Sequence, residues 1–273
     1  MKPVAFDYAS ATDAPTAFMA LKDHAGSARL MAGGQSLGPM LNLRLARPAL
    51  IVDVSRTAAL RGVTQTADAI IYGASITHAE VEDGIVPDAT PGWMADVARH
   101  IAYRAIRNRG TLGGSLAHAD PAADWVNVLT ALDACVELKG PTGSRTLLLE
   151  HFFMGPFTTA LALDEMIEAI VVPRRDATAS WGYEKFCRKV GDFSQASAAV
   201  LIDPARGQTR VLLGAIEAAP ILLNNAEALI SGHASVVDAV SKALPERSVE
   251  ANALHVQAVV RAIAKALAAG ART

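Results

Sequence analysis

Two short segments, each with a Gly-Gly pair, constrain most strongly how this chain can fold. The first, Ala32-Gly33-Gly34-Gln35-Ser36, closes a short strand candidate, and the second is Thr111-Leu112-Gly113-Gly114-Ser115. Glycine adopts positive φ at low steric cost, and such a turn can direct successive backbone N–H groups toward one anion. One Gly-Gly pair alone is more often a simple turn without a ligand. The two turns together predict a site for a diphosphate.

The familiar nucleotide-binding fingerprints do not fit these turns. Gly33 to Gly38 has the glycine spacing of a Walker loop, but Pro39 stands where the lysine belongs, and no G-x-G-x-x-G opens a helix. Backbone N–H groups from two sides need no lysine, and Arg107 and Arg109 precede the second turn, where a guanidinium would add charge. The alternative for these two arginines is a solvated surface pair.

Composition excludes several classes of function. The chain has 273 residues, 51% of them hydrophobic, and a formal net charge of -2, which indicates an ordered globular protein and no nucleic-acid partner. Cys135 and Cys187, the only cysteines, lack C-x-x-C spacing, so we expect reduced thiols and no iron–sulfur or zinc site.

The amino terminus lacks a signal-peptide core and no long uninterrupted apolar run occurs, so we expect a cytoplasmic protein without an integral membrane segment.

Polar residues follow the second glycine turn. His118 and Asp120 form an H-x-D pattern, and Asp124 follows. Helix capping explains these residues better than a metal site, and Asp120 and Asp124 can also accept hydrogen bonds from sugar hydroxyls. Neither a Ser–His–Asp arrangement nor a G-x-S-x-G elbow is present, so we assign no catalytic residue and no metal ligand. Any chemistry is expected to come from a cofactor.

Periodicity predicts an α+β chain with a boundary near residue 173. A small α/β unit is expected first, then two hairpins with helices between them, and then a strand that Pro173 ends. A compositional shift follows, and the last part is expected to hold three strands and alanine-rich helices. The expected strands are 4–8, 29–32, 50–54, 60–64, 69–72, 134–138, 144–149, 166–172, 180–186, 196–203 and 209–215; the expected helices are 13–22, 93–101, 120–132, 220–230, 236–243 and 249–269.

These motifs in this order resemble the FAD-binding medium subunit of the molybdenum hydroxylases, the family of xanthine dehydrogenase and carbon monoxide dehydrogenase. The resemblance implies a two-subdomain FAD-binding fold of the vanillyl-alcohol-oxidase (PCMH) type over 1–172, with subdomains of about 1–57 and 58–172. A separate α+β domain, a three-stranded sheet with a helical bundle, would occupy 173–273. The residues that carry the resemblance are 32–37, 107–115, 119–124, 152–153, Thr158, 164–167, 185–186 and 191–193.

The same resemblance implies a set of FAD contacts. Both glycine turns would hold the diphosphate, His118, Asp120 and Asp124 would meet ribityl or ribose hydroxyls, and Ile167, Lys185 and Phe193 would lie near the flavin ring. Ser115 replaces a frequent asparagine, and Phe193 stands where related chains often have tyrosine. The implied contacts in the two turns are Ala32, Gly33, Gly34, Gln35, Ser36, Thr111, Gly113, Gly114 and Ser115.

The resemblance also implies partner chains. A large subunit would carry the molybdopterin cofactor and a small subunit two [2Fe-2S] clusters, in a dimer of heterotrimers, with electrons passing through FAD to an external acceptor. Two alternatives stay open: a stand-alone flavin oxidase of the vanillyl-alcohol-oxidase type, and a non-catalytic assembly module in which the glycine turns are only structural. The sequence names neither the substrate nor the electron acceptor.

Overall fold

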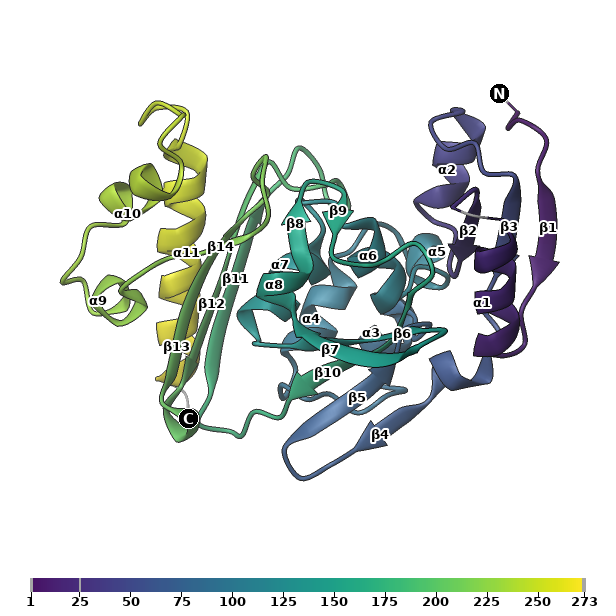
Figure 1. Cartoon of the computed structure of the whole chain (residues 1–273). Helices are drawn as coiled ribbons and strands as arrows, with labels where there is room; N and C mark the ends of the chain where they lie inside the picture. The colour runs from purple at the N-terminus through teal and green to yellow at the C-terminus, as the bar shows by residue number, and fades with distance from the viewer. Residues whose placement is uncertain (1, 25, 272–273) are drawn as a thin grey trace.

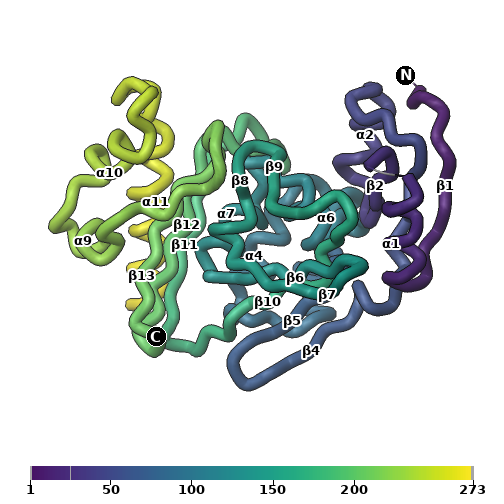
Figure 2. Tube along the Cα trace, in the orientation of Figure 1, coloured from purple at the N-terminus to yellow at the C-terminus, as the bar shows by residue number. Residues whose placement is uncertain are grey.

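The computed structural model describes residues 2–24 and 26–271, and it confirms the mixed α+β class. Three blocks, each built on its own sheet, lie side by side, with the N-terminal block at one end and the C-terminal block at the other (Figure 1). The chain passes through the blocks in sequence order and its two ends lie far apart (Figure 2). The central block therefore contacts both of its neighbours.

The N-terminal block is a parallel sheet in the order β1-β3-β2. Its helix α1 begins where the Asp13 side chain accepts a hydrogen bond from Thr16 N at 2.8 Å, and it buries Ala17, Phe18 and Leu21. Because the strands are parallel, their carboxyl ends meet at one edge, and the first glycine turn leaves the sheet there. The elements are β1 Asp7–Ser10, α1 Ala14–Asp23, β2 Ala28–Met31, α2 Leu37–Asn42 and β3 Leu50–Asp53.

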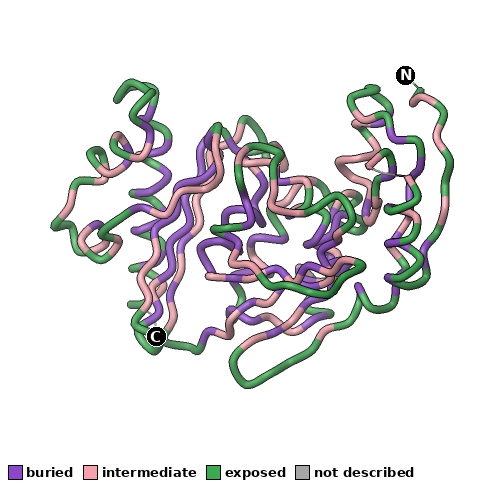
Figure 3. Tube along the Cα trace, viewed as in Figure 1, coloured by how far each residue is buried: buried purple, intermediate pink, exposed green. Residues whose placement is uncertain are grey.

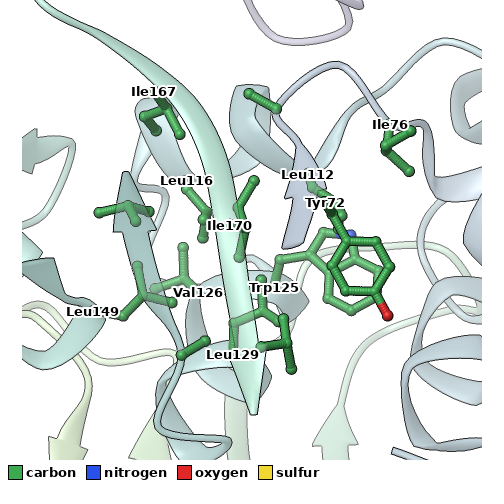
Figure 4. Packing of buried hydrophobic residues seen from close by; sticks show 14 of the residues in the cluster. Tyr72, Ile76, Leu112, Leu116, Trp125, Val126, Leu129, Leu149, Ile167 and Ile170 are labelled. Carbon is green, nitrogen blue, oxygen red and sulfur yellow. The ribbon is translucent and has the colours of Figure 1, made fainter. Parts of the chain in front are cut away.

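The central block has an antiparallel sheet in the order β4-β5-β10-β6-β7. Helices α6 and α7 bury apolar side chains against β5 and β10, and Leu112, Leu116, Trp125 and Ile170 meet in this core (Figure 4). The elements are η1 Ala58–Arg61, β4 Val63–Gln65, β5 Ala69–Gly73, α3 His78–Glu82, α4 Trp93–Arg99, α5 Arg104–Arg107, α6 Leu112–His118, α7 Asp124–Ala131, β6 Cys135–Gly140, β7 Gly143–Leu148, α8 Leu149–Phe152, β8 Phe153–Gly155, β9 Thr158–Thr159 and β10 Met166–Pro173.

One helix of this block begins later than the sequence predicts. The expected start at Asp120 is wrong, because the Asp120 carboxylate accepts a hydrogen bond from Ala122 N at 2.9 Å and closes a turn instead. Helix α7 begins only at Asp124, after an extended Ala123. Asp120 therefore stands on a loop between α6 and α7.

The C-terminal block is a four-stranded antiparallel sheet in the order β11-β12-β13-β14. The prediction of three strands and a helix from 220 is wrong, because Ile221 and Leu222 pair with β13 and the helix starts at Ala226. The elements are β11 Ser180–Phe186, β12 Ala196–Asp203, η2 Pro204–Arg206, β13 Gln208–Gly214, β14 Ile221–Leu222, α9 Ala226–Ile230, α10 Val236–Ala243 and α11 Ala253–Gly270.

This sheet is covered on both faces. Helix α11 packs along one face, and α7 contacts the other, so β12 is buried almost throughout its length (Figure 3). The Trp93 ring of α4 stacks on Trp181 of β11 with 5.3 Å between centroids. Arg175 and Asp203, both almost fully buried, form an ion pair of 2.6 Å across the same junction. The hydrophobic core thus continues from the central block into the C-terminal sheet.

Helix α11 is the one helix within residues 2–24 and 26–271 that is long and apolar enough, by length and composition alone, to cross a membrane, with a mean hydropathy of 1.2 over 18 residues. Alanine supplies much of that value. One face of the helix is buried against the sheet, and Arg261 and Lys265 beside that face form ion pairs with Glu184 of β11 at 3.5 and 2.7 Å. Helix α11 therefore packs on the sheet of this block through one face.

Candidate functional site

The two glycine turns lie in direct contact. A Cβ atom on Gly33 would stand 2.0 Å from the carbonyl oxygen of Arg109 and 2.9 Å from Gly110 Cα, so only glycine fits there. In return, Arg109 Nε donates to the Gly33 carbonyl oxygen at 3.3 Å, across 76 positions of sequence. The first turn of the N-terminal block is therefore packed on the peptide that enters the second turn.

The first turn presents unpaired backbone donors. Gly34 has φ of +71°, and Gln35 Nε2 donates to Gly33 O at 3.0 Å, which closes the turn. Within the part of the chain that the structure describes, the N–H groups of Gly33, Gly34, Gln35 and Ser36 have no intramolecular acceptor. Successive unpaired N–H groups around a left-handed residue form a nest for an anion. Ala32, at the start of the turn, is half-buried.

The second turn uses its N–H groups internally. Gly113 N donates to Ala74 O at 2.8 Å, Gly114 N to Thr111 Oγ1 at 3.0 Å, and Ser115 N to Thr111 O at 3.0 Å. A Cβ on Gly113 would lie 2.5 Å from Ala74 Cβ, so glycine allows α6 to sit against β5. Free backbone donors are therefore concentrated in the first turn, since among the described residues Thr111 N is the one N–H group of the second turn without an acceptor. The second turn offers the exposed Gly114 backbone and the Ser115 side chain.

The two arginines before the second turn differ in role. Arg107 is buried, and its Nε and Nη2 atoms bind both carboxylate oxygens of Glu82 at 2.7 and 2.9 Å. The alternative of a solvated surface pair is wrong for Arg107, which is buried and joins α5 to α3 through Glu82. Arg109 is exposed, and no carboxylate in residues 2–24 or 26–271 lies within ion-pair distance of it. Its charge is therefore available beside the first turn.

A buried histidine, His78, is hydrogen-bonded to the peptide that enters the second turn. His78 N donates to Gly110 O at 2.9 Å, and Trp125 Nε1 donates to His78 Nδ1 at 3.0 Å. Burial lowers the pKa of His78 to about 3, and the positive charge of Arg107 adds to this effect. His78 is therefore neutral. The sequence pattern Thr77-x-x-Glu80, a capping box that starts α3, was the only signal for this residue.

His118 and Asp120 lie at the end of α6. The His118 ring approaches Phe157 with 5.2 Å between centroids, and burial lowers the pKa of His118. Ala119 between them has φ of +51°, which ends the helix and turns the chain. The described residues contain no group of three or more His, Cys, Asp or Glu that would hold a metal ion.

The structure brings Asp124 and Lys185 together. Lys185 Nζ lies 2.8 Å from Asp124 Oδ1 and also donates to His100 O at 3.0 Å. Tyr183, which sequence reasoning missed, donates its hydroxyl to the same carboxylate oxygen at 2.8 Å. Ile167 is buried in β10, whereas Phe193 is exposed on the loop between β11 and β12. Asp124 thus links α7 to the C-terminal sheet, a contact that its sugar-binding prediction did not include.

Comparisons with known proteins agree with this arrangement. The family model for the FAD binding domain in molybdopterin dehydrogenase matches residues 4–175. The chain is 39% identical over 205 residues to the nicotine 6-hydroxylase medium subunit of Paenarthrobacter nicotinovorans, covering 75% of this chain and 71% of that protein. It is 36% identical over 236 residues to the caffeine dehydrogenase subunit beta of Pseudomonas sp. (strain CBB1), covering 85% of this chain and 80% of that protein.

Among solved structures, a chain of carbon monoxide dehydrogenase from Hydrogenophaga pseudoflava superimposes with a TM-score of 0.91 at 31% identity, over 98% of this chain and 99% of that chain. A chain of quinoline 2-oxidoreductase from Pseudomonas putida 86 gives a TM-score of 0.87 at 29% identity, over 99% of both chains. The likeness therefore extends through all three blocks. This chain belongs to the family of FAD-binding medium subunits of the molybdopterin hydroxylases.

Proposed function

We propose that this chain binds FAD by its diphosphate at the first glycine turn and passes electrons from the [2Fe-2S] clusters of a small partner subunit to an external acceptor. The observation that carries the proposal is the row of unpaired N–H groups from Gly33 to Ser36, fixed against the Arg109 peptide. When bound, FAD supplies the electron-transfer chemistry that no side chain of the site provides.

The residues of the site fit this cofactor. A diphosphate needs several donors at one point, and the first turn supplies four N–H groups (Gly33, Gly34, Gln35 and Ser36) next to the guanidinium of Arg109, which has no carboxylate partner among the described residues. The contact between the turns leaves no room for a side chain at Gly33. The proposed FAD-contacting residues are Ala32, Gly33, Gly34, Gln35, Ser36, Thr111, Gly113, Gly114, Ser115, His118, Asp120, Asp124, Ile167, Lys185 and Phe193.

We assign different roles to two groups of these residues. The turns bind the diphosphate, and the polar residues after α6 form hydrogen bonds with sugar hydroxyls. The Nζ atom of Lys185 lies 2.8 Å from Asp124 Oδ1, on the side of α7 that faces the C-terminal block. We assign Gly113 and Thr111 the role of shaping the second turn, because Gly113 N donates to Ala74 O and Thr111 accepts hydrogen bonds from Gly114 N and Ser115 N.

Within the wider assembly, we assign residues 1–172 to a PCMH-type FAD domain with subdomains of 1–57 and 58–172, and 173–273 to the C-terminal domain. The partners are a large subunit with the molybdopterin cofactor and a small [2Fe-2S] subunit, in a cytoplasmic dimer of heterotrimers. Support comes from the resemblance of the whole chain to a carbon monoxide dehydrogenase subunit. The relatives named for nicotine and caffeine indicate that substrate choice varies between complexes that share this type of subunit.

A binding experiment tests the cofactor assignment. The purified full chain, freed of flavin, should take up FAD in a one-to-one ratio and quench its fluorescence, and it should bind FMN much more weakly because FMN lacks the diphosphate. The complex assembled without this chain should still reduce its iron–sulfur clusters with substrate but should fail to reduce an external acceptor. Absence of FAD uptake by the full chain would contradict the proposal.

A further inference from the structure

An acidic residue, Asp53, lies next to the first glycine turn and has no assigned role in the site described so far. Asp53 is the last residue of β3, the middle strand of the N-terminal sheet, and it pairs in register with Met31, the last residue of β2. Val54 N also donates to Met31 O at 3.0 Å. Because Met31 directly precedes the turn, Asp53 lies at the same sheet edge, one strand away from the unpaired N–H groups.

The Asp53 carboxylate is held in one orientation. Tyr8 on β1 donates its hydroxyl to Oδ2 at 2.7 Å, and Ser55 N donates to Oδ1 at 2.8 Å. A carboxylate oxygen accepts more than one hydrogen bond, so each oxygen keeps a free lone pair. The side chain is only half-buried, which leaves it accessible to a ligand.

The charges around Asp53 keep it ionised. Burial opposes ionisation, but the hydrogen bonds from Tyr8 and Ser55 and the positive charge of Arg109 together lower the pKa of Asp53. Arg109 therefore lies within electrostatic reach of both the carboxylate and the first turn, where its Nε meets Gly33 O at 3.3 Å. One corner of the sheet thus combines unpaired N–H donors, a guanidinium and a carboxylate.

The N–H groups, the guanidinium and the carboxylate bind different kinds of ligand atom. The N–H groups and the guanidinium attract phosphate, whereas an ionised carboxylate repels phosphate and accepts hydrogen bonds from hydroxyls. A nucleoside diphosphate carries both kinds of group a few bonds apart, since its ribose hydroxyls follow the phosphates. Parallel sheets that bind dinucleotides commonly place an acidic residue at the end of a neighbouring strand for the ribose.

We infer that Asp53 accepts hydrogen bonds from the ribose hydroxyls of the adenosine half of FAD, and that Tyr8 is a positioning residue for its carboxylate. The inference rests on the proposed FAD function and extends it to a second part of the cofactor. It leaves His118, Asp120 and Asp124 for hydroxyls elsewhere on the cofactor.

Ligand analogues test this assignment without any substitution. ADP, 2′-deoxy-ADP and 3′-deoxy-ADP are used to displace FAD from the full wild-type chain. A hydrogen bond to a charged acceptor contributes about 1.5 to 3 kcal/mol, so loss of the hydroxyl that Asp53 binds should weaken ADP about tenfold or more. Equal affinity for ADP and both deoxy analogues would overturn the inference.

Variants then link this discrimination to Asp53. D53N should weaken ADP binding about tenfold, and it should leave the binding of the deoxy analogue that lacks the Asp53-bound hydroxyl almost unaffected. Y8F should keep most of the difference in affinity between ADP and that analogue, because the carboxylate stays. D7N is the matched control, since Asp7 lies at the opposite end of the sheet on β1. If D53N weakens ADP and both deoxy analogues equally, the assignment of Asp53 is wrong while FAD binding stands. If the wild-type chain takes up no FAD, the proposed function fails and this inference fails with it.

Discussion

Replacement of Gly33 by alanine tests whether contact between the two turns is what builds the site. The added Cβ would lie 2.0 Å from Arg109 O, 2.7 Å from Arg109 C and 2.9 Å from Gly110 Cα. All three are backbone atoms, so no side-chain rotation relieves the overlap. An ordinary contact begins near 3.4 Å, so the turns would have to separate by about 3.4 − 2.0 = 1.4 Å.

The size of the effect follows from this separation. Overpacking of a close contact costs about 1 to 3 kcal/mol, and part of that cost appears as lower stability of the flavin-free chain. The shift also carries the N–H groups of the first turn away from Arg109, which holds Gly33 O at 3.3 Å. We expect FAD affinity to fall by about a factor of ten to one hundred, since each tenfold loss corresponds to about 1.4 kcal/mol.

The matched control is Gly38→Ala, five positions further on. Gly38 lies in α2, and a Cβ there would meet no atom within 4 Å. Alanine favours helix over glycine by about 1 kcal/mol, so this variant should be as stable as the wild type or slightly more stable. FAD binding should be unchanged.

Two measurements decide the outcome. Urea unfolding of the flavin-free chains gives the free energy of unfolding, and titration with FAD, followed by quenching of flavin fluorescence, gives the dissociation constant. If Gly33→Ala unfolds and binds FAD as Gly38→Ala does, the contact between the turns is not what forms the site. A stability loss with normal FAD affinity would equally refute the link between the contact and cofactor binding.

Three further predictions follow from individual contacts. R109Q should lower the affinity for FAD about five- to tenfold and reduce the salt dependence of binding. The free energy of unfolding should change little, because the side chain is exposed. Unchanged FAD affinity in low salt would argue against a role for the Arg109 charge. D203N should lower the free energy of unfolding by about 3 to 5 kcal/mol, since it leaves the buried Arg175 without its ion-pair partner, and a loss below about 1 kcal/mol in urea would contradict this. The pKa of His78 is about 3 in the folded chain and lies near 6.5 when unfolded, so the unfolded state binds the extra proton and stability should fall by up to about 1.4 kcal/mol per pH unit as pH drops below 6.5. H78Q should show a flatter pH dependence of unfolding, and identical slopes would refute a buried neutral His78.

Local sequence signals predicted many of the elements well. Strand 180–186, strand 196–203 and helix 236–243 match the observed β11, β12 and α10, because periodicity and flanking turns agree there. The helix start at Asp120 failed because a side chain bound the backbone two residues ahead, a competing local turn. The helix expected from 220 failed because β13 offers its edge to Ile221 and Leu222. Both failures come from hydrogen bonds whose geometry the local pattern does not specify.

For the site, the sequence alone placed glycine where the backbone must turn or approach closely, since a Cβ at Gly33 would overlap the Arg109 peptide and glycine adopts the positive φ of Gly34 at the lowest steric cost. The order of its motifs also pointed to the FAD-binding family. Gly114 N and Ser115 N are bound locally by Thr111, which caps α6, whereas the tertiary structure decided that Gly113 N is not free, because it donates to Ala74 O. The same is true of Arg107 and Arg109, near neighbours in sequence that folding separates into a buried ion pair and an available charge. Long-range packing, which brings residue 33 against residue 109, determines these partners, and no local pattern encodes it.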